Sequence, residues 1–424
     1  MKERIIIKAF YTVTRNVPTR IVVTLYTFPP IPRYNAPMAL NCGIVGLPNV
    51  GKSTIFSALS SAPAEAANYP FCTINPNVGI VDVPDERLLK LSALFKPERT
   101  IPAAVEFVDI AGLVKGASRG EGLGNQFLSH IREVGVIAQV VRCFDDPDIV
   151  HVSNKVDPES DMETINVELA LADLDTLSKR RERAERALKV QAKAEQKIAE
   201  TVLTALDKIG PLLEAGKPAR SANLSDDERA AVYDCHFVSA KPQLYVCNVD
   251  EETMKAISTG KNVNAAIPSI AAMRSIAYID TVKQRAAAEG SEAVIICGKF
   301  EAELADIDDP AEKLAFLEEL GLADSGLGAL VHAAYRLLGL QTFFTCGSDE
   351  CRAWTVHGGD TAPKAAGVIH TDFEKGFIKA EVYSYEDIIK YGSEAKIKEA
   401  GKYRIEGKEY ILRDGDVMFF KFNV

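Results

Sequence analysis

The sequence lacks the features that would place it among membrane, metal-cluster or polyanion-coating proteins. No run of about 18 uncharged apolar residues occurs in its 424 residues, so we expect no membrane span. None of the eight cysteines forms a CxxC pair, which disfavours a metal site and favours buried thiols in a reducing compartment. The net charge of −10 disfavours a protein that coats DNA or another nucleic acid through its overall charge, but local basic patches stay compatible with it.

The first 37 residues differ in charge and composition from the rest of the chain. They carry several lysines and arginines but a single acid, Glu3, as transit peptides do. Their prolines and β-branched residues do not suit an amphipathic targeting helix. We therefore expect residues 1–37 to be a disordered extension, or the product of a start codon upstream of Met38, and we expect the cytoplasm as location.

Short apolar runs alternate with helical segments over the next 300 residues. This alternation predicts an α/β fold with a parallel sheet, in a nucleotide-binding domain spanning residues 38–339. The expected strands are Cys42–Val45, Val105–Val108, Val136–Cys143, Gln243–Cys247 and Ala293–Cys297.

A segment at about residues 162–238 interrupts this alternation. From Leu174 to Ile209 its positions follow a heptad spacing that is apolar at both ends and polar in the middle, and Gly210-Pro211 is expected to end the helix. With a returning helix at Ser225–Cys235, the pattern predicts an inserted, partly coiled-coil helical hairpin. Lys179–Lys197 holds eight basic and three acidic residues. Either this is a solvated helix face, or it contacts nucleic acid or the ribosome.

The last 85 residues have a third sequence pattern, of short apolar runs separated by turns. Short strands are expected at Phe343-Phe344, Trp354–Val356, Gly376–Val382 and Val417–Phe422, with helical turns at Glu386–Lys390 and Glu394–Lys398. We therefore expect a small separate α+β domain over residues 340–424.

The strongest motif is Gly46–Ser53, which matches GxxxxGK[ST] between a strand and a helix. In such a P-loop, backbone N–H groups of residues such as Asn49, Val50 and Gly51 surround the phosphates. Lys52 reaches the β- and γ-phosphates, and the Ser53 hydroxyl is a ligand for Mg²⁺. Thr54 opens the helix that follows.

Three further residues are candidates for the phosphate and Mg²⁺ site. Asp109 follows the strand Val105–Val108 and starts Asp109-Ile110-Ala111-Gly112, so its carboxylate is a candidate Mg²⁺ ligand and the Gly112 N–H a γ-phosphate contact. Thr73 lies in the loop before the next strand and is the candidate second hydroxyl for Mg²⁺. Leu113 stands where many GTPases have a glutamine that orients the attacking water. His151 is our first candidate for that role and His130 the second, although each residue type is more often structural.

Two segments compete as the base-reading motif. Asn154–Asp157 matches NKxD, the guanine motif, but only six residues separate Cys143 from Val150, too few for a crossover to a parallel strand. We therefore interpret it as a loop that enters the helical insert. Asn248–Glu251 follows a strand after a long crossover. Asn248 suits an adenine, while Val249 and Glu251 replace the lysine and the guanine-specifying aspartate, so this segment favours ATP.

These motifs together resemble the YchF, or Obg-like, ATPases of the translation-factor class of P-loop proteins, from about Met38 to Val424. The resemblance rests on Gly43–Thr54, on Asp109–Ala117, on Asn248–Glu251 and on His370–Phe377, which is similar to the family's C-terminal TGS domain. It implies a G domain, an inserted helical hairpin and a β-grasp TGS domain. It also implies an ATPase that uses Mg²⁺ and associates with ribosomes, with the large subunit and rRNA as contacts. K⁺ is a further candidate cation.

Three functions stay open on the sequence. The first is a regulatory ATPase switch on ribosomes, in translation or a stress response. The second is a GTPase of ribosome assembly, which would follow if Asn154–Asp157 reads the base. The third is a nucleotide-gated binding module with negligible hydrolysis, which Leu113 permits.

Overall fold

The computed structural model describes residues 41–61, 77–110, 123–189, 192–259, 269–307, 309–319, 322 and 325–423. Residues 39–424 belong to one compact unit. No helix in this described part of the chain is long and apolar enough to cross a membrane.

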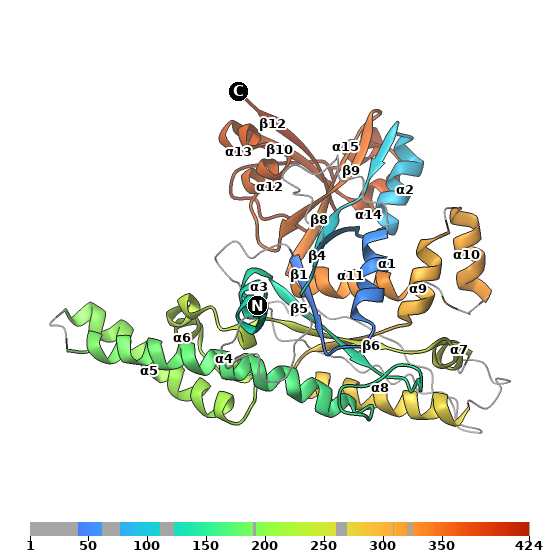
Figure 1. Ribbon diagram of the computed structural model, residues 1–424. Coiled ribbons are helices and arrows are strands. Elements are labelled where there is room, and N and C mark those ends of the chain that lie inside the picture. The colour runs from blue at the N-terminus through green and yellow to red at the C-terminus, as the bar shows by residue number, and fades with distance from the viewer. Residues whose placement is uncertain are drawn as a thin grey trace, which may run out of the picture. The chain divides into compact units, whose positions relative to one another are not determined.

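The first sheet has six strands in the order β2-β4-β1-β5-β6-β7 (Figure 1). All neighbours are parallel except β2, which pairs antiparallel with β4 at the edge. Strand β5 is buried along its whole length, as expected for the middle of a parallel sheet covered on both faces. The five strands expected from the sequence are confirmed, and β2 was missed. The bounds are β1 (Asn41–Gly46), β2 (Val78–Asp82), β4 (Ala104–Asp109), β5 (Val136–Arg142), β6 (Gln243–Asn248) and β7 (Glu292–Ile296).

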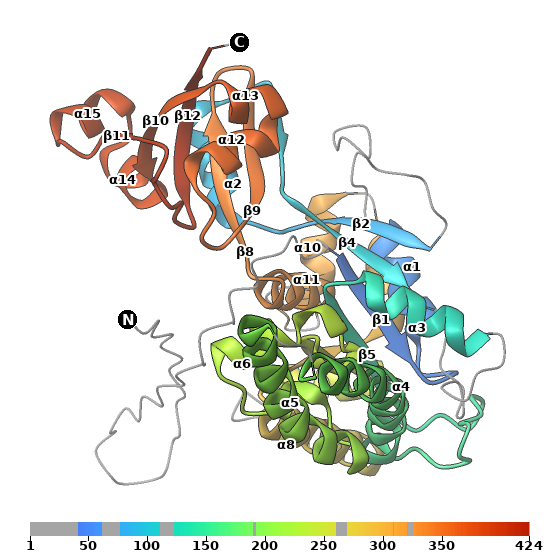
Figure 2. The same ribbon diagram turned by 90° about the vertical axis from the view of Figure 1, so that its left-hand side faces the viewer.

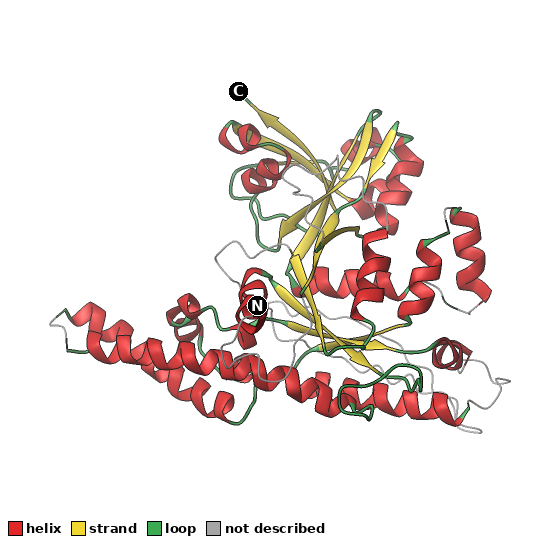
Figure 3. Cartoon of the chain, in the orientation of Figure 1, coloured by secondary structure: helices red, strands yellow, loops and turns green. Residues whose placement is uncertain are grey.

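Helices follow most of these strands and cover the sheet (Figure 3). Helix α1 packs beside α9, and α8 packs against β6, β7 and α7. The bounds are α1 (Lys52–Ser61), α3 (Leu123–Glu133), α7 (Glu251–Thr259), α8 (Ile270–Ala288), α9 (Gly298–Ala305), α10 (Pro310–Glu319) and α11 (Gly326–Leu337).

The helical insert is a hairpin, but its turn is not where the heptad spacing placed the end of the helix. Helix α4 (Pro158–Ala187) and helix α5 (Lys193–Glu214) lie side by side, and Pro211 is inside α5 (Figure 2). The expected stop at Gly210-Pro211 was therefore wrong. Folding back lets the two apolar ends of the heptad pattern bury each other in one cluster, with Leu177 beside residues such as Val202 and Leu206. Helix α6 (Asp226–Ala231) then begins with a capping box at Ser225 and Glu228.

The second sheet has the order β11-β10-β12-β8-β9-β3. The first and last strands of the C-terminal segment, β8 and β12, are parallel neighbours in its middle, and α12 packs across the core, which is a β-grasp arrangement. The short strands and turns expected here are confirmed, while β11, α12 and α13 were missed. The bounds are β8 (Leu340–Cys346), β9 (Glu350–His357), α12 (Ala362–Ile369), α13 (Thr371–Lys375), β10 (Phe377–Ser384), α14 (Tyr385–Tyr391), α15 (Glu394–Glu399), β11 (Arg404–Glu406) and β12 (Asp416–Phe422).

The edge strand of the second sheet comes from the N-terminal half of the chain. Strand β3 (Arg99–Ile101) pairs parallel with β9, and helix α2 (Glu86–Phe95) packs against β8 and β9. Arg87 of α2 forms an ion pair with Asp414, at 2.8 Å. No pattern in residues 86–101 predicted that they would join the C-terminal sheet.

Candidate functional site

The P-loop joins the carboxyl end of β1 to the start of α1. Two of its residues adopt left-handed backbone, Asn49 with φ 62° and Gly51 with φ 91°. A Cβ atom on Gly51 would lie 2.0 Å from Asn248 Nδ2, so no side chain fits at this position. The sharp turn brings backbone N–H groups and the N-terminus of α1 to one place, which is the arrangement that binds phosphate.

Lys52 and Asp109 meet beside this turn. Asp109 is the last residue of β4, which is the parallel neighbour of β1, and its carboxylate forms an ion pair with the Lys52 ammonium. Both side chains are largely buried, whereas Ser53 and Thr54 are exposed on the first turn of α1. The two charged residues that the sequence assigned to phosphate and to Mg²⁺ are thus brought together.

The donor set here fits Mg²⁺. A carboxylate and a hydroxyl are hard oxygen ligands, and Mg²⁺ is usually held by one or two such groups together with substrate phosphates. Asp109 and Ser53 are the described residues that would hold it. When bound, the ion would neutralise negative charge on the transferred phosphoryl group.

Asn248 holds the P-loop against the end of β7. Its Nδ2 donates to the Val50 carbonyl at 2.9 Å, and its Oδ1 accepts from the Gly298 N–H at 3.0 Å. The side chain is 5% exposed. An asparagine amide has two N–H groups and two acceptor lone pairs, so one of each is left for a base.

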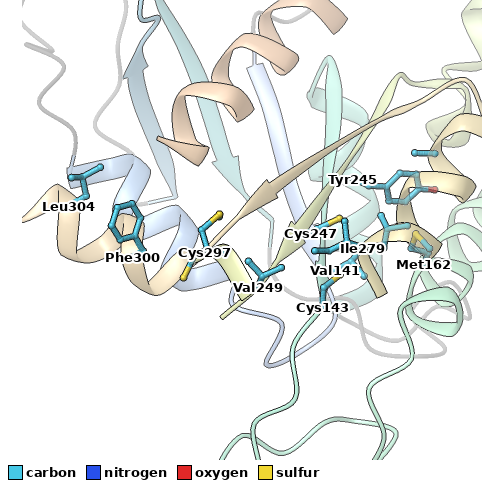
Figure 4. Packing of buried hydrophobic residues seen from close by; sticks show 13 residues of the cluster. Val141, Cys143, Met162, Tyr245, Cys247, Val249, Ile279, Cys297, Phe300 and Leu304 are labelled. Atoms are coloured by element: carbon cyan, nitrogen blue, oxygen red, sulfur yellow. The ribbon is translucent and has the colours of Figure 1, made fainter. Parts of the chain in front are cut away.

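The next two candidates for base binding lie in different surroundings. Val249 is 3% exposed and belongs to a hydrophobic cluster that includes Cys247 and Cys297 (Figure 4), so its side chain does not face a ligand and the sequence-based assignment needs correction. Glu251 opens α7 and pairs with Lys299 at 2.8 Å. Lys299 was not predicted from the sequence, although it lies at the start of α9, three residues after the end of β7, and so stands at the same edge of the sheet.

A buried arginine shapes the loop beside the P-loop. Arg142 ends β5, is 1% exposed, and donates to the carbonyl oxygens of Phe144, Asp146 and Ile149. The Asn49 Nδ2 in turn donates to the Val150 carbonyl at 3.0 Å. Nothing in the sequence pattern predicted a structural role for Arg142, because a lone arginine at the end of a strand is usually exposed.

The structure does not support His151 as the residue that orients water. The ring is 5% exposed, its Nε2 lies 3.0 Å from Asp161 Oδ2, and its Nδ1 accepts from the Ser153 N–H at 3.1 Å. Since Nδ1 is an acceptor, the proton is on Nε2 and is donated to Asp161. Both nitrogens are therefore used inside the protein, and the structural interpretation of His151 holds. The second candidate, His130, is exposed on α3.

Asn154–Asp157 lies in the loop that enters the insert, as the sequence predicted. Asp157 is the N-cap of α4, and its side chain accepts from the Ser160 N–H. The parallel neighbour of β5 that follows it in the chain is β6, which ends at Asn248. Thr73, Gly112 and Leu113 lie outside the described residues.

Comparison with known proteins agrees with this geometry. Residues 41–173 match a family model described as "50S ribosome-binding GTPase", and residues 340–423 match the model YchF-GTPase_C, described as a protein of unknown function. Over 387 residues the chain is 52% identical to "Ribosome-binding ATPase YchF" of Haemophilus ducreyi and 51% identical to that of Bacillus subtilis. Each alignment covers 91% of this chain and 100% of the relative.

The chain belongs to the YchF family. A solved structure, that of the Schizosaccharomyces pombe YchF GTPase, superposes with a TM-score of 0.78 at 36% identity, covering 91% of this chain and 99% of that one. The family resemblance stated from the sequence motifs is therefore confirmed. As a member of the YchF family with a P-loop GTPase domain, the chain is a nucleoside-triphosphate hydrolase.

Proposed function

We propose that this chain is an ATPase that binds ribosomes and acts there as a regulatory switch in translation or a stress response, in the cytoplasm. The relatives named as ribosome-binding ATPases match over 91% of the chain. The observation that carries the proposal within the molecule is the convergence of Lys52, Asp109 and Asn248 on one P-loop.

The residues divide the chemistry among them. Backbone N–H groups of Asn49, Val50 and Gly51 bind the phosphates, and Lys52 exchanges its partner Asp109 for phosphate oxygens. Asp109, Ser53 and Thr73 are the residues that would hold Mg²⁺, while Thr54 and Gly112 would complete the phosphate site. Positive charge fixed around the transferred phosphoryl group stabilises the charge that develops in the transition state.

Selection of adenine rests on Asn248 and Glu251. In guanine, the N1–H and the 2-amino group donate hydrogen bonds to the aspartate of NKxD. Adenine has neither donor, so it loses no hydrogen bond when that aspartate is absent. Asn248 keeps one N–H for the purine N7 after its bonds to Val50 and Gly298. Lys299 fixes the Glu251 carboxylate at the same edge.

Parallel titrations of the purified protein with ATP and GTP test this assignment. ATP is expected to bind more tightly, and Glu251→Asp is expected to raise the affinity for GTP relative to ATP by at least about tenfold, the size of one hydrogen bond to a charged group. The matched controls are Lys299→Ala, which removes the ion pair but keeps the carboxylate, and Asp157→Ala. A wild type that prefers GTP, and loses that preference in Asp157→Ala, would establish the GTPase alternative.

The hairpin end supplies the surface for the ribosome. Several of its basic residues are held by ion pairs, such as Arg181 with Asp207 and Lys179 with Asp175. Among the described residues of the hairpin end, Lys179–Lys197, four exposed cations have no acidic partner, namely Arg183, Lys189, Lys193 and Lys197. Unpaired cations at the tip of a long hairpin suit the phosphate backbone of rRNA.

A further inference from the structure

Two cysteines lie directly opposite each other at the end of the β8–β9 hairpin. The strand register pairs Cys346 with Cys351. The Gly347 N–H donates to the Glu350 carbonyl at 2.9 Å, so Gly347 and Glu350 form the hydrogen-bonded pair that closes the turn. Hydrogen-bonded and non-hydrogen-bonded pairs alternate along an antiparallel ladder, so Cys346 and Cys351 are a non-hydrogen-bonded pair. Such pairs have Cα atoms about 4.5 Å apart, within the range that a disulfide spans.

The two thiols share one buried face of the hairpin. Cys346 is 3% exposed and Cys351 0%, and the same face packs against α2, where Ser92 hydrogen-bonds to the Cys351 thiol. A hydrogen bond between the thiols raises the pKa of Cys346 and lowers the pKa of Cys351. Cys351 is therefore the better nucleophile of the two, because the thiolate is the reactive form.

A second cysteine pair in the chain provides a contrast. Cys143 and Cys247 also interact, but Cys143 directly follows β5, and the register of β5 with its parallel neighbour β6 pairs Cys247 with Val141, two residues before Cys143. Both belong to the core of the first sheet. Cys346 and Cys351, in contrast, are separated from solvent by one turn, whose Ser348 and Asp349 are exposed. Proteins open locally at a lower free energy than global unfolding requires, so local opening of this turn would give a reagent access to the two thiols.

We propose that Cys346 and Cys351 form a reversible dithiol–disulfide site that low-molecular-weight disulfides such as glutathione disulfide oxidise. The Cys351 thiolate attacks one sulfur of the reagent, whose S–S bond breaks and releases one thiol. Cys346 then gives up its proton and attacks the Cys351 sulfur of the mixed disulfide, which releases the second thiol. Two electrons pass from the two cysteine sulfurs to the reagent.

The Cys346–Cys351 disulfide would form next to a place where two parts of the chain that are distant in sequence pack together. The turn between the cysteines accepts hydrogen bonds from the N-terminal half, from Glu98 N–H to Ser348 O at 3.0 Å and from Arg99 N–H to Asp349 O at 3.2 Å. These bonds continue into the pairing of β3 with β9. Oxidation would tie the two strands of the hairpin together next to this junction.

The test uses the folded full-length protein, incubated with glutathione disulfide or with reduced glutathione, alkylated, and cleaved at Asp349, which lies between the two cysteines. Mass spectrometry should show the two fragments linked after oxidation and separate after reduction. In Cys346→Ser the resolving thiol is gone, so one glutathione should remain on Cys351. Cys143→Ser is the matched control and should leave the Cys346–Cys351 link intact.

Several outcomes would overturn the proposal. Both cysteines could remain alkylatable after oxidation, or the link could form only in denaturant. A stable glutathione adduct on the wild-type protein would show that Cys346 does not resolve it. Thermal melting of each variant, reduced, checks that the fold is retained, and the double variant Cys346→Ala/Cys351→Ala should melt within a few degrees of wild type and form no link.

Discussion

The roles proposed for Lys52 and Asp109, which form an ion pair, differ: Lys52 would bind phosphate and Asp109 would bind Mg²⁺. Substitution of Lys52 tests its role. In Lys52→Ala the charge that stabilises the transferring phosphoryl group is lost, and turnover should fall at least about 100-fold, as for loss of other transition-state donors. The fold should survive, because Lys52 contacts Asp109 at the edge of the site and not the core. Phosphate release, with thermal melting of the same samples, measures both effects.

The matched control for this variant is Lys90→Ala. Lys90 is exposed on α2, where it pairs with Glu86 one helical turn away. Such pairs contribute about 0.3–0.5 kcal/mol, and Lys90 is remote from the P-loop, so turnover should stay at the wild-type level. Wild-type turnover in Lys52→Ala itself would remove the lysine from the site.

His151 yields a prediction about stability and not about catalysis. His151→Ala leaves the Asp161 carboxylate buried without its donor, and burial already raises the pKa of Asp161. A loss of about 2–4 kcal/mol in the free energy of unfolding is expected, since a buried acceptor is left unsatisfied. Denaturant titration measures this loss. Single-turnover hydrolysis by the folded variant should stay within about threefold of wild type, and a tenfold loss with unchanged stability would restore a catalytic role.

The residues of the site divide into those that sequence reasoning could find and those that it could not. Lys52, Ser53 and Asp109 could be proposed from the sequence because a motif or the end of a strand fixes their place. Arg142 and Lys299 were missed because their roles exist only through partners distant along the chain or in space, such as Ile149 and Glu251. His151 was misassigned for the same reason: its partner Asp161 lies on the following helix.

At the scale of elements, periodicity identified strands better than it identified turns between helices. The strands around the nucleotide site were predicted because each is a short apolar run with a distinct end. The heptad spacing continues without a break between the end of α4 and the start of α5, so the sequence pattern alone did not show that α4 and α5 are separate helices. Only mutual burial of the two apolar ends decides between one long helix and a hairpin.

The junction between the insert and the nucleotide domain carries a pH-dependent interaction. Asp173 of α4 accepts from the Val238 and Ser239 N–H groups, both at 2.8 Å, and is 1% exposed. Desolvation raises its pKa to about 6 from an ordinary value of 3.8, despite these hydrogen bonds. The folded protein therefore binds this proton more tightly than the unfolded chain does, so the stabilisation is present below about pH 4 and is lost as pH rises through about 6.

Asp173→Asn isolates this contribution. The difference in the free energy of unfolding between wild type and Asp173→Asn should fall by about 3 kcal/mol between pH 4 and pH 6 and stay constant above, since each pKa unit is worth about 1.4 kcal/mol. Urea titrations of the two proteins across this range measure it. A difference that rises with pH would mean that the N–H donors outweigh desolvation and lower the pKa instead.

For the whole molecule, the boundary between the nucleotide domain and the C-terminal domain is not a simple point in the sequence. Residues 86–101 leave the first sheet after β2, pack α2 on the C-terminal strands and add β3 to their sheet. Composition could not reveal this, because both sheets use similar short apolar strands. A domain division at residue 339 therefore describes the order of the chain. In space, residues 86–101 pack with the C-terminal strands.

At the scale of the whole molecule, the proposed contact with the ribosome can be tested through the unpaired cations at the end of the hairpin. Lys189→Glu, Lys193→Glu and Lys197→Glu together reverse three exposed charges at the tip, and each lies on a turn or helix surface with no acidic partner among the residues that the structure describes. Binding to rRNA phosphates would release counterions, so the triple variant should bind ribosomes at least about tenfold more weakly at moderate salt and show a shallower salt dependence.

Co-sedimentation of the protein with ribosomal subunits across a salt series measures this, and shows which subunit is bound. The control carries the same charge change at Lys283, Lys402 and Lys408, which are exposed elsewhere on the chain. Because the tip is a helical hairpin built apart from the P-loop, ATP turnover without ribosomes should be unchanged in both triple variants. Equal loss of binding in the two would show that net charge acts and not the tip, and unchanged binding in the tip variant would leave its cations as a solvated helix face.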